Sequence, residues 1–267
     1  MRKIFLLIIL FSEVLVAQPR VLVSVAPQKF LVEQIAQDRV KVDVIVPDGA
    51  SPHTYEPTPR QAVALGKGDV WFRIGESFET RLIKILESKM EIIDQREGLD
   101  LLKDGCCGCK DSSDPHIWLS PALLKKEAEQ ITEVLSRRSP ESAPFFRKNY
   151  AVLCKKIDLL DEEIAFLLRD KWGEAILVSH PAFGYFCRDY GLRQIAIEAD
   201  GKEPSTKRVL ELLKEAREAS ISSVYLQRQY SMRGGERIAK ELQAKVIMVD
   251  PYEEDVISNL KLFAKTL

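Results

Sequence analysis

One long amphipathic segment divides this sequence into two halves and constrains the fold more than any other feature. Apolar residues recur there at steps of three and four, the spacing of one helix face. They are Phe146, Tyr150, Leu153, Ile157, Leu160, Ile164 and Leu167. A helix over 143–169 would be roughly 40 Å long at about 1.5 Å per residue. That length exceeds one small domain, so the segment predicts a rigid connector between two.

On both sides of this segment, short runs typical of strands alternate with helical patterns. The strand-like runs lie at 21–26, 40–46, 70–74 and 91–94, and then at 175–179, 192–197, 221–226 and 245–249. Alternating strands and helices predict parallel sheets covered by helices. We therefore expect an α/β fold of two lobes, residues 18–141 and 171–267, joined by a connector helix at 142–170.

The first 17 residues have the pattern of a signal peptide. Arg2 and Lys3 precede an apolar run at 4–11, and Ala17 is a small residue suited to cleavage. The run is shorter than the roughly 18–20 residues that a membrane-spanning helix needs. No cysteine lies near the cleavage point, which argues against a lipid anchor. The sequence thus predicts an exported, periplasmic protein that begins near Gln18.

The balance of charge argues against a nucleic-acid partner. Removing Arg2, Lys3 and Glu13 from 39 basic and 40 acidic residues leaves 37 and 39, a net charge of −2. A nucleic-acid surface requires a strong basic bias, which this composition lacks.

The hydrophobic share of 46% is enough for well-buried cores. We also expect the protein to be a monomer.

All three histidines stand beside a proline, in the sequences SPHT, DPHI and SHPA around His53, His116 and His180. Proline pushes its neighbours toward extended or turn geometry, so these imidazoles are expected on loops or at strand ends. Any one of them alone would be read more simply as an ordinary polar histidine. Three together in such positions favour a metal site, because imidazole is the commonest metal-ligand side chain.

The predicted strands bring the histidines together with one aspartate. Ligands of open α/β sheets bind outside the carboxyl ends of the strands. His180 and Asp250 follow strand-like runs of the second half, and His53 and His116 lie in post-strand loops of the first. Each lobe would then supply two ligands to a site between them. Three imidazoles and one carboxylate suit Zn²⁺ or a similar divalent ion.

Several motifs resemble a known family, the zinc- and manganese-binding solute-binding proteins of ABC importers, nearly end to end. The matching stretches are 25–27 (VAP), 49–59 (GASPHTYEPTP), 114–121 (DPHIWLSP), 179–186 (SHPAFGYF), 203–205 (EPS) and 249–251 (VDP). The resemblance implies two α/β lobes joined by one long helix, with the ion held between them and delivered to a membrane ABC permease.

Carried over residue by residue, the resemblance implies that His53, His116, His180 and Asp250 are the metal ligands. A histidine at the third position, where manganese members often have glutamate, leans toward Zn²⁺, with Mn²⁺ or Fe²⁺ as alternatives. Pro181 departs from the family, because many relatives have aspartate there. That departure leaves open how His180 is oriented.

Two alternatives to a transport protein remain. If Asp250 were not a ligand, three histidines would leave an open position on zinc for water, as in a hydrolase with Glu56 or Asp114 as general base. The sequence contains no His-Glu-x-x-His helix, nucleophile elbow or phosphate loop, so we expect no enzyme. Some relatives are called surface adhesins, but nothing in this sequence argues for that role.

A glycine-rich polar stretch before His116 carries Cys106, Cys107 and Cys109. It predicts an exposed loop, in which the thiols could capture a soft metal. Disulfides or free thiols are the simpler interpretation, because three thiols lack a fourth ligand and an exported chain tends to be oxidised. Cys154, beside Leu153 on the predicted connector, is interpreted as a packing residue.

Overall fold

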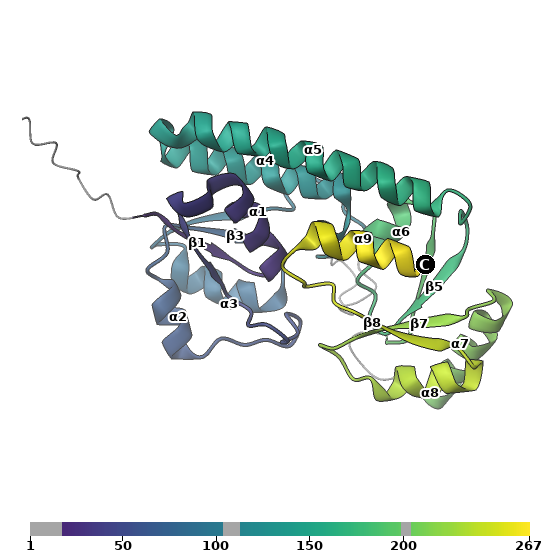
Figure 1. The fold of residues 1–267 in the computed structure, drawn as a ribbon. Helices are drawn as coiled ribbons and strands as arrows, with labels where there is room; N and C mark the ends of the chain where they lie inside the picture. The colour runs from purple at the N-terminus through teal and green to yellow at the C-terminus, as the bar shows by residue number, and fades with distance from the viewer. Residues whose placement is uncertain (1–17, 104–112, 199–203) are drawn as a thin grey trace, which may run out of the picture.

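Two parallel sheets form the frame of the molecule (Figure 1). The computed structural model describes residues 18–103, 113–198 and 204–267, so the predicted signal peptide and the Cys106, Cys107 and Cys109 cluster lie outside the described residues. The first sheet has the order β2-β1-β3-β4 and the second β6-β5-β7-β8, with every pairing parallel. The strands are β1 (Arg20–Val23), β2 (Lys41–Val44), β3 (Val70–Arg73), β4 (Glu91–Asp94), β5 (Ala175–Val178), β6 (Arg193–Ala196), β7 (Ser223–Gln227) and β8 (Lys245–Val249).

Helices cover both faces of each sheet, which confirms the predicted α/β class of two lobes with parallel sheets. The α-helices are α1 (Ala26–Ala36), α2 (Pro59–Leu65), α3 (Ser77–Leu86), α4 (Pro121–Arg138), α5 (Ala143–Leu168), α6 (Gly184–Asp189), α7 (Thr206–Glu218), α8 (Arg233–Leu242) and α9 (Val256–Thr266). Three short 3₁₀ turns complete the described elements, η1 (Gln37–Arg39), η2 (Ile117–Leu119) and η3 (Pro140–Ser142).

The long periodic segment forms the connecting helix α5, which spans 26 residues and ends one residue before the predicted 169. It runs beside α4 along one side of the molecule, from the first sheet to the second (Figure 1). Its apolar face packs against α1 and α4 of the first lobe and against α9 of the second. The domain limits at residues 18–141, 142–170 and 171–267 stay a prediction.

A single apolar cluster continues from one lobe into the other beneath α5. Strand alternation sends Val21 and Val23 into this shared cluster and Leu22 to a separate one on the opposite face of the first sheet. In the second lobe the Phe183 and Phe263 rings stack within the shared cluster, with centroids 4.1 Å apart. Separating the lobes would expose this surface to water, so hydrophobic burial holds their relative position.

Polar contacts between the lobes reinforce this packing. Trp118 Nε1 donates to the Pro251 carbonyl at 2.7 Å, and the Tyr185 hydroxyl donates to the Asp114 carbonyl at 2.8 Å. The ammonium of Lys29 on α1 lies 2.8 Å from the carboxylate of Glu254. The two buried hydrogen bonds flank the stretch around His116, so this segment is tied directly to the second lobe.

Local structure departs from the sequence patterns in two places. The strand-like run at 21–26 is longer than the strand itself, because β1 ends at Val23 and α1 begins at Ala26. Pro27 is tolerated in a first helical turn, and the Gln28 side chain accepts hydrogen bonds from the Ser24 and Val25 amides. The short helix α6 was not predicted, because six residues carry too little periodicity.

Thr58 and Ser120 cap the N-termini of α2 and α4, since each hydroxyl accepts from the backbone amide three residues later. Cys154 lies half-buried on α5, and Cys187 is buried on α6. Within 18–103, 113–198 and 204–267, no helix has both the length and the hydropathy to cross a bilayer.

Glu127 on α4 is a buried carboxylic acid whose hydrogen-bonding capacity is not met by the described residues. The residue is 0% exposed, and among the described residues neither carboxylate oxygen has a hydrogen-bond partner. Burial raises the pKa of Glu127 well above its ordinary value of 4.5. The folded protein therefore keeps this side chain protonated at pH values where the unfolded chain has lost the proton.

We expect Glu127→Met to stabilise the protein at neutral pH. Between pH 4.5 and the raised pKa of Glu127 the folded state binds more protons than the unfolded state. The wild-type free energy of unfolding then falls with rising pH, by at most about 1.4 kcal/mol per unit. The methionine variant has no proton to lose at this position, so its free energy of unfolding does not fall with pH in this way. Urea unfolding should show that Glu127→Met raises the free energy of unfolding more at pH 7 than at pH 5. The control Glu133→Met, on the exposed face of α4, should not raise it. An equal effect at both pH values would contradict this account.

Candidate metal centre

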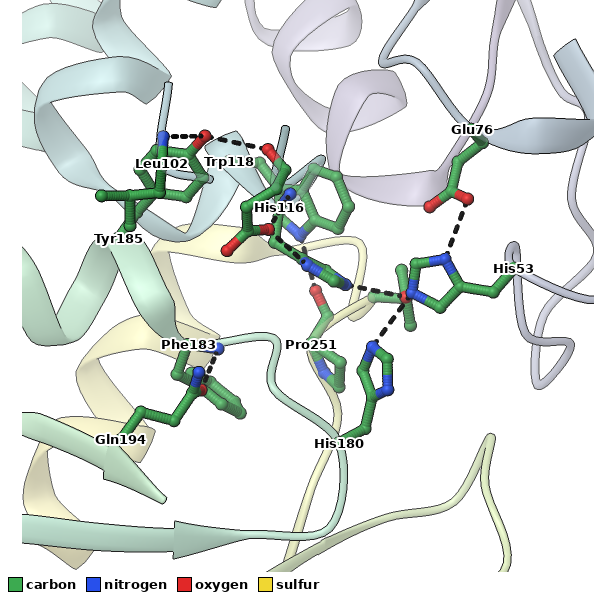
Figure 2. Close-up of polar contacts among 12 residues, drawn as sticks. His53, Glu76, Leu102, His116, Trp118, His180, Phe183, Tyr185, Gln194 and Pro251 are labelled. Atoms are coloured by element: carbon green, nitrogen blue, oxygen red, sulfur yellow. Dashed lines mark hydrogen bonds and ion pairs between the residues drawn. The ribbon is translucent and has the colours of Figure 1, made fainter. Parts of the chain in front are cut away.

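The three histidines converge on one point between the lobes. One ring nitrogen from each of His53, His116 and His180 lies within 4.8 Å of the others, and Figure 2 shows the three rings turned toward one another. The Nε2 atoms of His53 and His180 are 3.0 Å apart. His116 and His180 are buried, and His53 is partly exposed. The sequence prediction that the histidines form one cluster is therefore confirmed, although they are separated by more than 60 residues at each step.

The carboxyl ends of the strands place these side chains. His53 lies in the loop that connects β2 to α2, His116 stands directly before η2, and His180 follows β5 by two residues. Strands β1 and β5 occupy equivalent inner positions in two sheets of the same order. The site thus lies outside the carboxyl ends of the strands, where ligands of open parallel sheets bind.

Glu76 orients His53. Its Oε2 atom lies 2.9 Å from His53 Nδ1, as the dashed line in Figure 2 marks, and the Glu76 side chain is almost fully buried. Glu76 stands at the N-terminus of α3, just beyond β3. This contact leaves His53 Nε2 to face the centre, which is the arrangement of a carboxylate behind a metal-binding histidine.

Asp114 performs the same task for His116. Its Oδ1 atom lies 2.8 Å from His116 Nδ1 and also accepts from the His116 backbone amide at 2.9 Å. The Asp114 carbonyl in turn accepts from the Tyr185 hydroxyl. Because Nδ1 is engaged in this way, Nε2 of His116 is the atom that faces the other two rings.

His180 is held by residues that are distant in sequence. The Gln227 side chain accepts from the His180 amide at 2.9 Å and donates to the His180 carbonyl at 3.0 Å. Glu198 Oε2 lies 3.5 Å from His180 Nδ1, and the Tyr230 ring stacks on the imidazole with centroids 4.1 Å apart. The orientation left open by Pro181 is thus provided by the Gln227 hydrogen bonds and the Tyr230 stack, while His180 Nδ1 has no hydrogen-bond partner among the described residues.

Burial, and after it the positive charge of His116 and His53 when protonated, lowers the pKa of His180 well below its ordinary value. His180 is therefore neutral at physiological pH. A neutral imidazole has a free nitrogen lone pair, which is the form that binds a metal ion.

Asp250, the predicted fourth ligand, follows β8 but has other partners. Its Oδ1 accepts from Gln229 Nε2 at 2.7 Å and from the Tyr252 amide at 2.9 Å. Its Oδ2 lies 2.6 Å from Arg228 Nε. In the described part of the chain, the cluster of possible metal-binding groups consists of the three histidines and does not include Asp250.

The candidate general bases of the hydrolase alternative have clear partners too. Glu56 is an exposed residue whose carboxylate binds Arg81 at 2.5 and 3.1 Å. Asp114 is occupied by His116. Trp118 is fully buried, and its ring centroid lies 5.4 Å from that of His116.

Sequence reasoning missed the residues that surround the ligands, namely Glu76, Glu198, Gln227, Tyr230 and Tyr252. For Glu76, Glu198 and Gln227, the strand pattern of the sequence did contain a signal. Glu76 and Glu198 closely follow β3 and β6, and Gln227 ends β7, so all three lie at the carboxyl edge where the histidines were expected. The two tyrosines stand in loops whose course the strand pattern does not reveal.

Three oriented imidazoles with carboxylates behind them fit a borderline-soft divalent cation. Zinc is bound by histidine nitrogen at about 2.0–2.1 Å, and imidazole also suits copper, iron and nickel. Carboxylates that accept from the distal ring nitrogen raise the basicity of the ligating nitrogen. The donor set therefore fits zinc, and its burial between the lobes separates a bound ion from bulk water.

Comparison with known proteins agrees with this chemistry. The profile of the family described as zinc-uptake complex component A, periplasmic (ZnuA), matches residues 21–265. A putative metal-binding protein of Chlamydia trachomatis serovar D is 37% identical over 272 residues, covering 99% of this chain and 98% of that protein. The high-affinity zinc uptake system protein ZnuA of Bacillus subtilis is 26% identical over 243 residues, covering 85% of this chain and 76% of that one.

Solved structures share the fold. The crystal structure of a ZnuA protein superposes with a TM-score of 0.87 at 35% identity, covering 93% of this chain and 97% of that chain. The periplasmic zinc-binding protein TroA of Treponema pallidum has the same fold, with a TM-score of 0.84 at 18% identity and coverage of 93% and 97%. The chain belongs to the zinc-uptake component A family, the metal-binding solute-binding proteins of ABC importers.

Proposed function

We propose that this protein captures a zinc ion between its lobes and delivers it to a membrane ABC permease. The observation that carries the proposal is the convergence of three buried or partly buried imidazoles within 4.8 Å, contributed by both lobes. Family membership supports the transport role, and the zinc-binding relatives support the choice of metal. Mn²⁺ and Fe²⁺ are the competing ions to test.

The proposed ligand atoms are the Nε2 nitrogens of His53, His116 and His180, because a carboxylate lies beside each Nδ1. The resemblance implies Asp250 as a fourth ligand, although its carboxylate pairs with Arg228 in this structure. Protons compete with the metal for the ring nitrogens, so affinity falls at acid pH. Delivery would require the ion to leave this site at the permease, with no chemical turnover.

Membership in a transport family gives no support to the hydrolase alternative. The known role of the family is metal capture, and neither candidate base is poised beside the histidines as a free carboxylate. We also propose a periplasmic location, where the family works and where a signal peptide at residues 1–17 would direct the chain.

The first test is metal content. We expect the purified, reduced protein to bind about one Zn²⁺ per chain and to prefer it over Mn²⁺ and Fe²⁺ in competition with a chelator. His116→Ala removes a buried ligand and should lower zinc affinity by more than about 100-fold, since loss of a ligand exceeds the 10–100-fold effect of an outer contact. Asn149→Ala, which removes a bond to the Ile35 carbonyl away from the site, is the control. No bound metal in the wild type would overturn the proposal.

The second test addresses the carboxylate behind His116. Asp114→Asn keeps the size of the side chain but loses the charge that holds Nδ1 at 2.8 Å. We expect zinc affinity to fall about 10–100-fold with the fold intact. Asp161→Asn is a matched control, because Asp161 accepts from the Tyr190 hydroxyl far from the histidines. Equal affinities for the two variants would show that Asp114 does not orient a ligand.

A further inference from the structure

The Tyr252 hydroxyl contacts one member of the histidine cluster. It is 3.2 Å from Nε2 of His116, the nitrogen proposed to bind the metal, and 3.2 Å from the Tyr230 hydroxyl. The Tyr252 ring packs against Trp118, with centroids 5.6 Å apart. A phenol oxygen thus lies beside the proposed ligand atom of His116, and it comes from the segment that follows Asp250.

Both lobes hold Tyr252 in place. Its amide donates to Asp250 Oδ1 at 2.9 Å, and the preceding Pro251 carbonyl accepts from Trp118 Nε1 of the first lobe at 2.7 Å. Asn259 on α9 donates to the Asp250 carbonyl at 2.7 Å. These bonds restrain the backbone on either side of Pro251, so the phenol is presented by a rigid turn.

Asp250, by contrast, is held in an ion-pair network at the edge of the site. Arg228 Nε lies 2.6 Å from Asp250 Oδ2, and the same guanidinium reaches Asp48 Oδ1 of the first lobe at 2.6 Å. Gln229 and the Tyr252 amide occupy Oδ1. To ligate a metal through Oδ2, Asp250 would have to leave its ion pair with Arg228.

We propose that Tyr252 is the fourth group that this chain presents to the metal, and that Arg228 keeps Asp250 out of the coordination sphere. Tetrahedral zinc with bonds of about 2.0–2.1 Å places neighbouring ligand atoms roughly 3.3 Å apart. His53 Nε2 lies 3.0 Å from His180 Nε2, and His116 Nε2 lies 3.2 Å from the Tyr252 hydroxyl, and both separations are close to that value. This inference rests on the proposed metal-binding function.

A tyrosine ligand at this position would influence which metal the site prefers. A phenol offers one oxygen, whereas a carboxylate can bind through two and so raise the coordination number. Mn²⁺ prefers sites rich in oxygen, and zinc accepts four ligands dominated by nitrogen. A tyrosine in place of the aspartate thus favours zinc over manganese.

The experiment compares Tyr252→Phe with Asp250→Asn in the full-length mature protein, using competitive titration with Zn²⁺ alone. We expect Tyr252→Phe to lower zinc affinity about 10–100-fold and Asp250→Asn to lower it less, because Asp250 acts only by holding the turn. Tyr225→Phe is the matched control, since it removes a hydroxyl that donates to the Thr266 carbonyl away from the site. The visible spectrum of the Co²⁺-loaded wild type should be four-coordinate and should change in Tyr252→Phe.

The outcomes separate this inference from the proposed function. A wild type that binds zinc, with a greater loss in Asp250→Asn than in Tyr252→Phe, overturns the inference and makes Asp250 the fourth ligand. A Co²⁺ spectrum that is the same in the wild type and in Tyr252→Phe also overturns the inference. The spectrum reports the ligands of the metal directly, so this result does not depend on how stable the variant is. A wild type that binds no zinc overturns the proposed function and the inference with it.

A double variant tests the role assigned to Arg228. Arg228→Gln in the Tyr252→Phe background releases the Asp250 carboxylate, so zinc affinity should recover in part and the preference for Zn²⁺ over Mn²⁺ should shrink. No recovery relative to Tyr252→Phe alone would overturn the claim that Arg228 withholds Asp250.

Discussion

The continuous apolar cluster beneath α5 is the interaction on which the rest of the structure depends. It buries side chains of both lobes in one core and leaves the lobes no independent surface along which to separate. The histidines come from both lobes, so their distances are meaningful only while the lobes keep their relation. Hydrophobic burial beneath α5 thus sets the spacing of the histidine nitrogens.

Within that frame, polar contacts determine what the site can bind. Glu76 and Asp114 turn His53 and His116 so that Nε2 faces inward, and Gln227 holds the backbone of His180. The contacts of Trp118 with Pro251 and of Tyr185 with Asp114 cross between the lobes at the same place. A preformed site loses little entropy when it receives an ion, which is an advantage for capture at low metal concentration.

Most of the fold could be predicted, because its signals are local. The period of 3.6 residues in α5 and the β-branched runs of the strands are properties of neighbouring residues, and the caps at Thr58 and Ser120 need only a few positions. Prediction was wrong where local signals conflict or are short. The strand-like run at 21–26 stops at Pro27, although proline is accepted in the first turn of a helix and α1 begins at Ala26. Helix α6 has six residues, too few to show the 3.6-residue periodicity of a helix.

The sequence by itself determined the alternation of strands and helices, the connector and the identity of three candidate ligands, because scarce histidines beside prolines at strand ends are visible without a structure. Only the tertiary structure decided how those ligands are oriented and what else reaches them. Glu198, Gln227 and Tyr252 meet the histidines from distant segments, and Asp250 pairs with Arg228. Such contacts depend on where side chains point once two lobes have packed together, which no local pattern encodes.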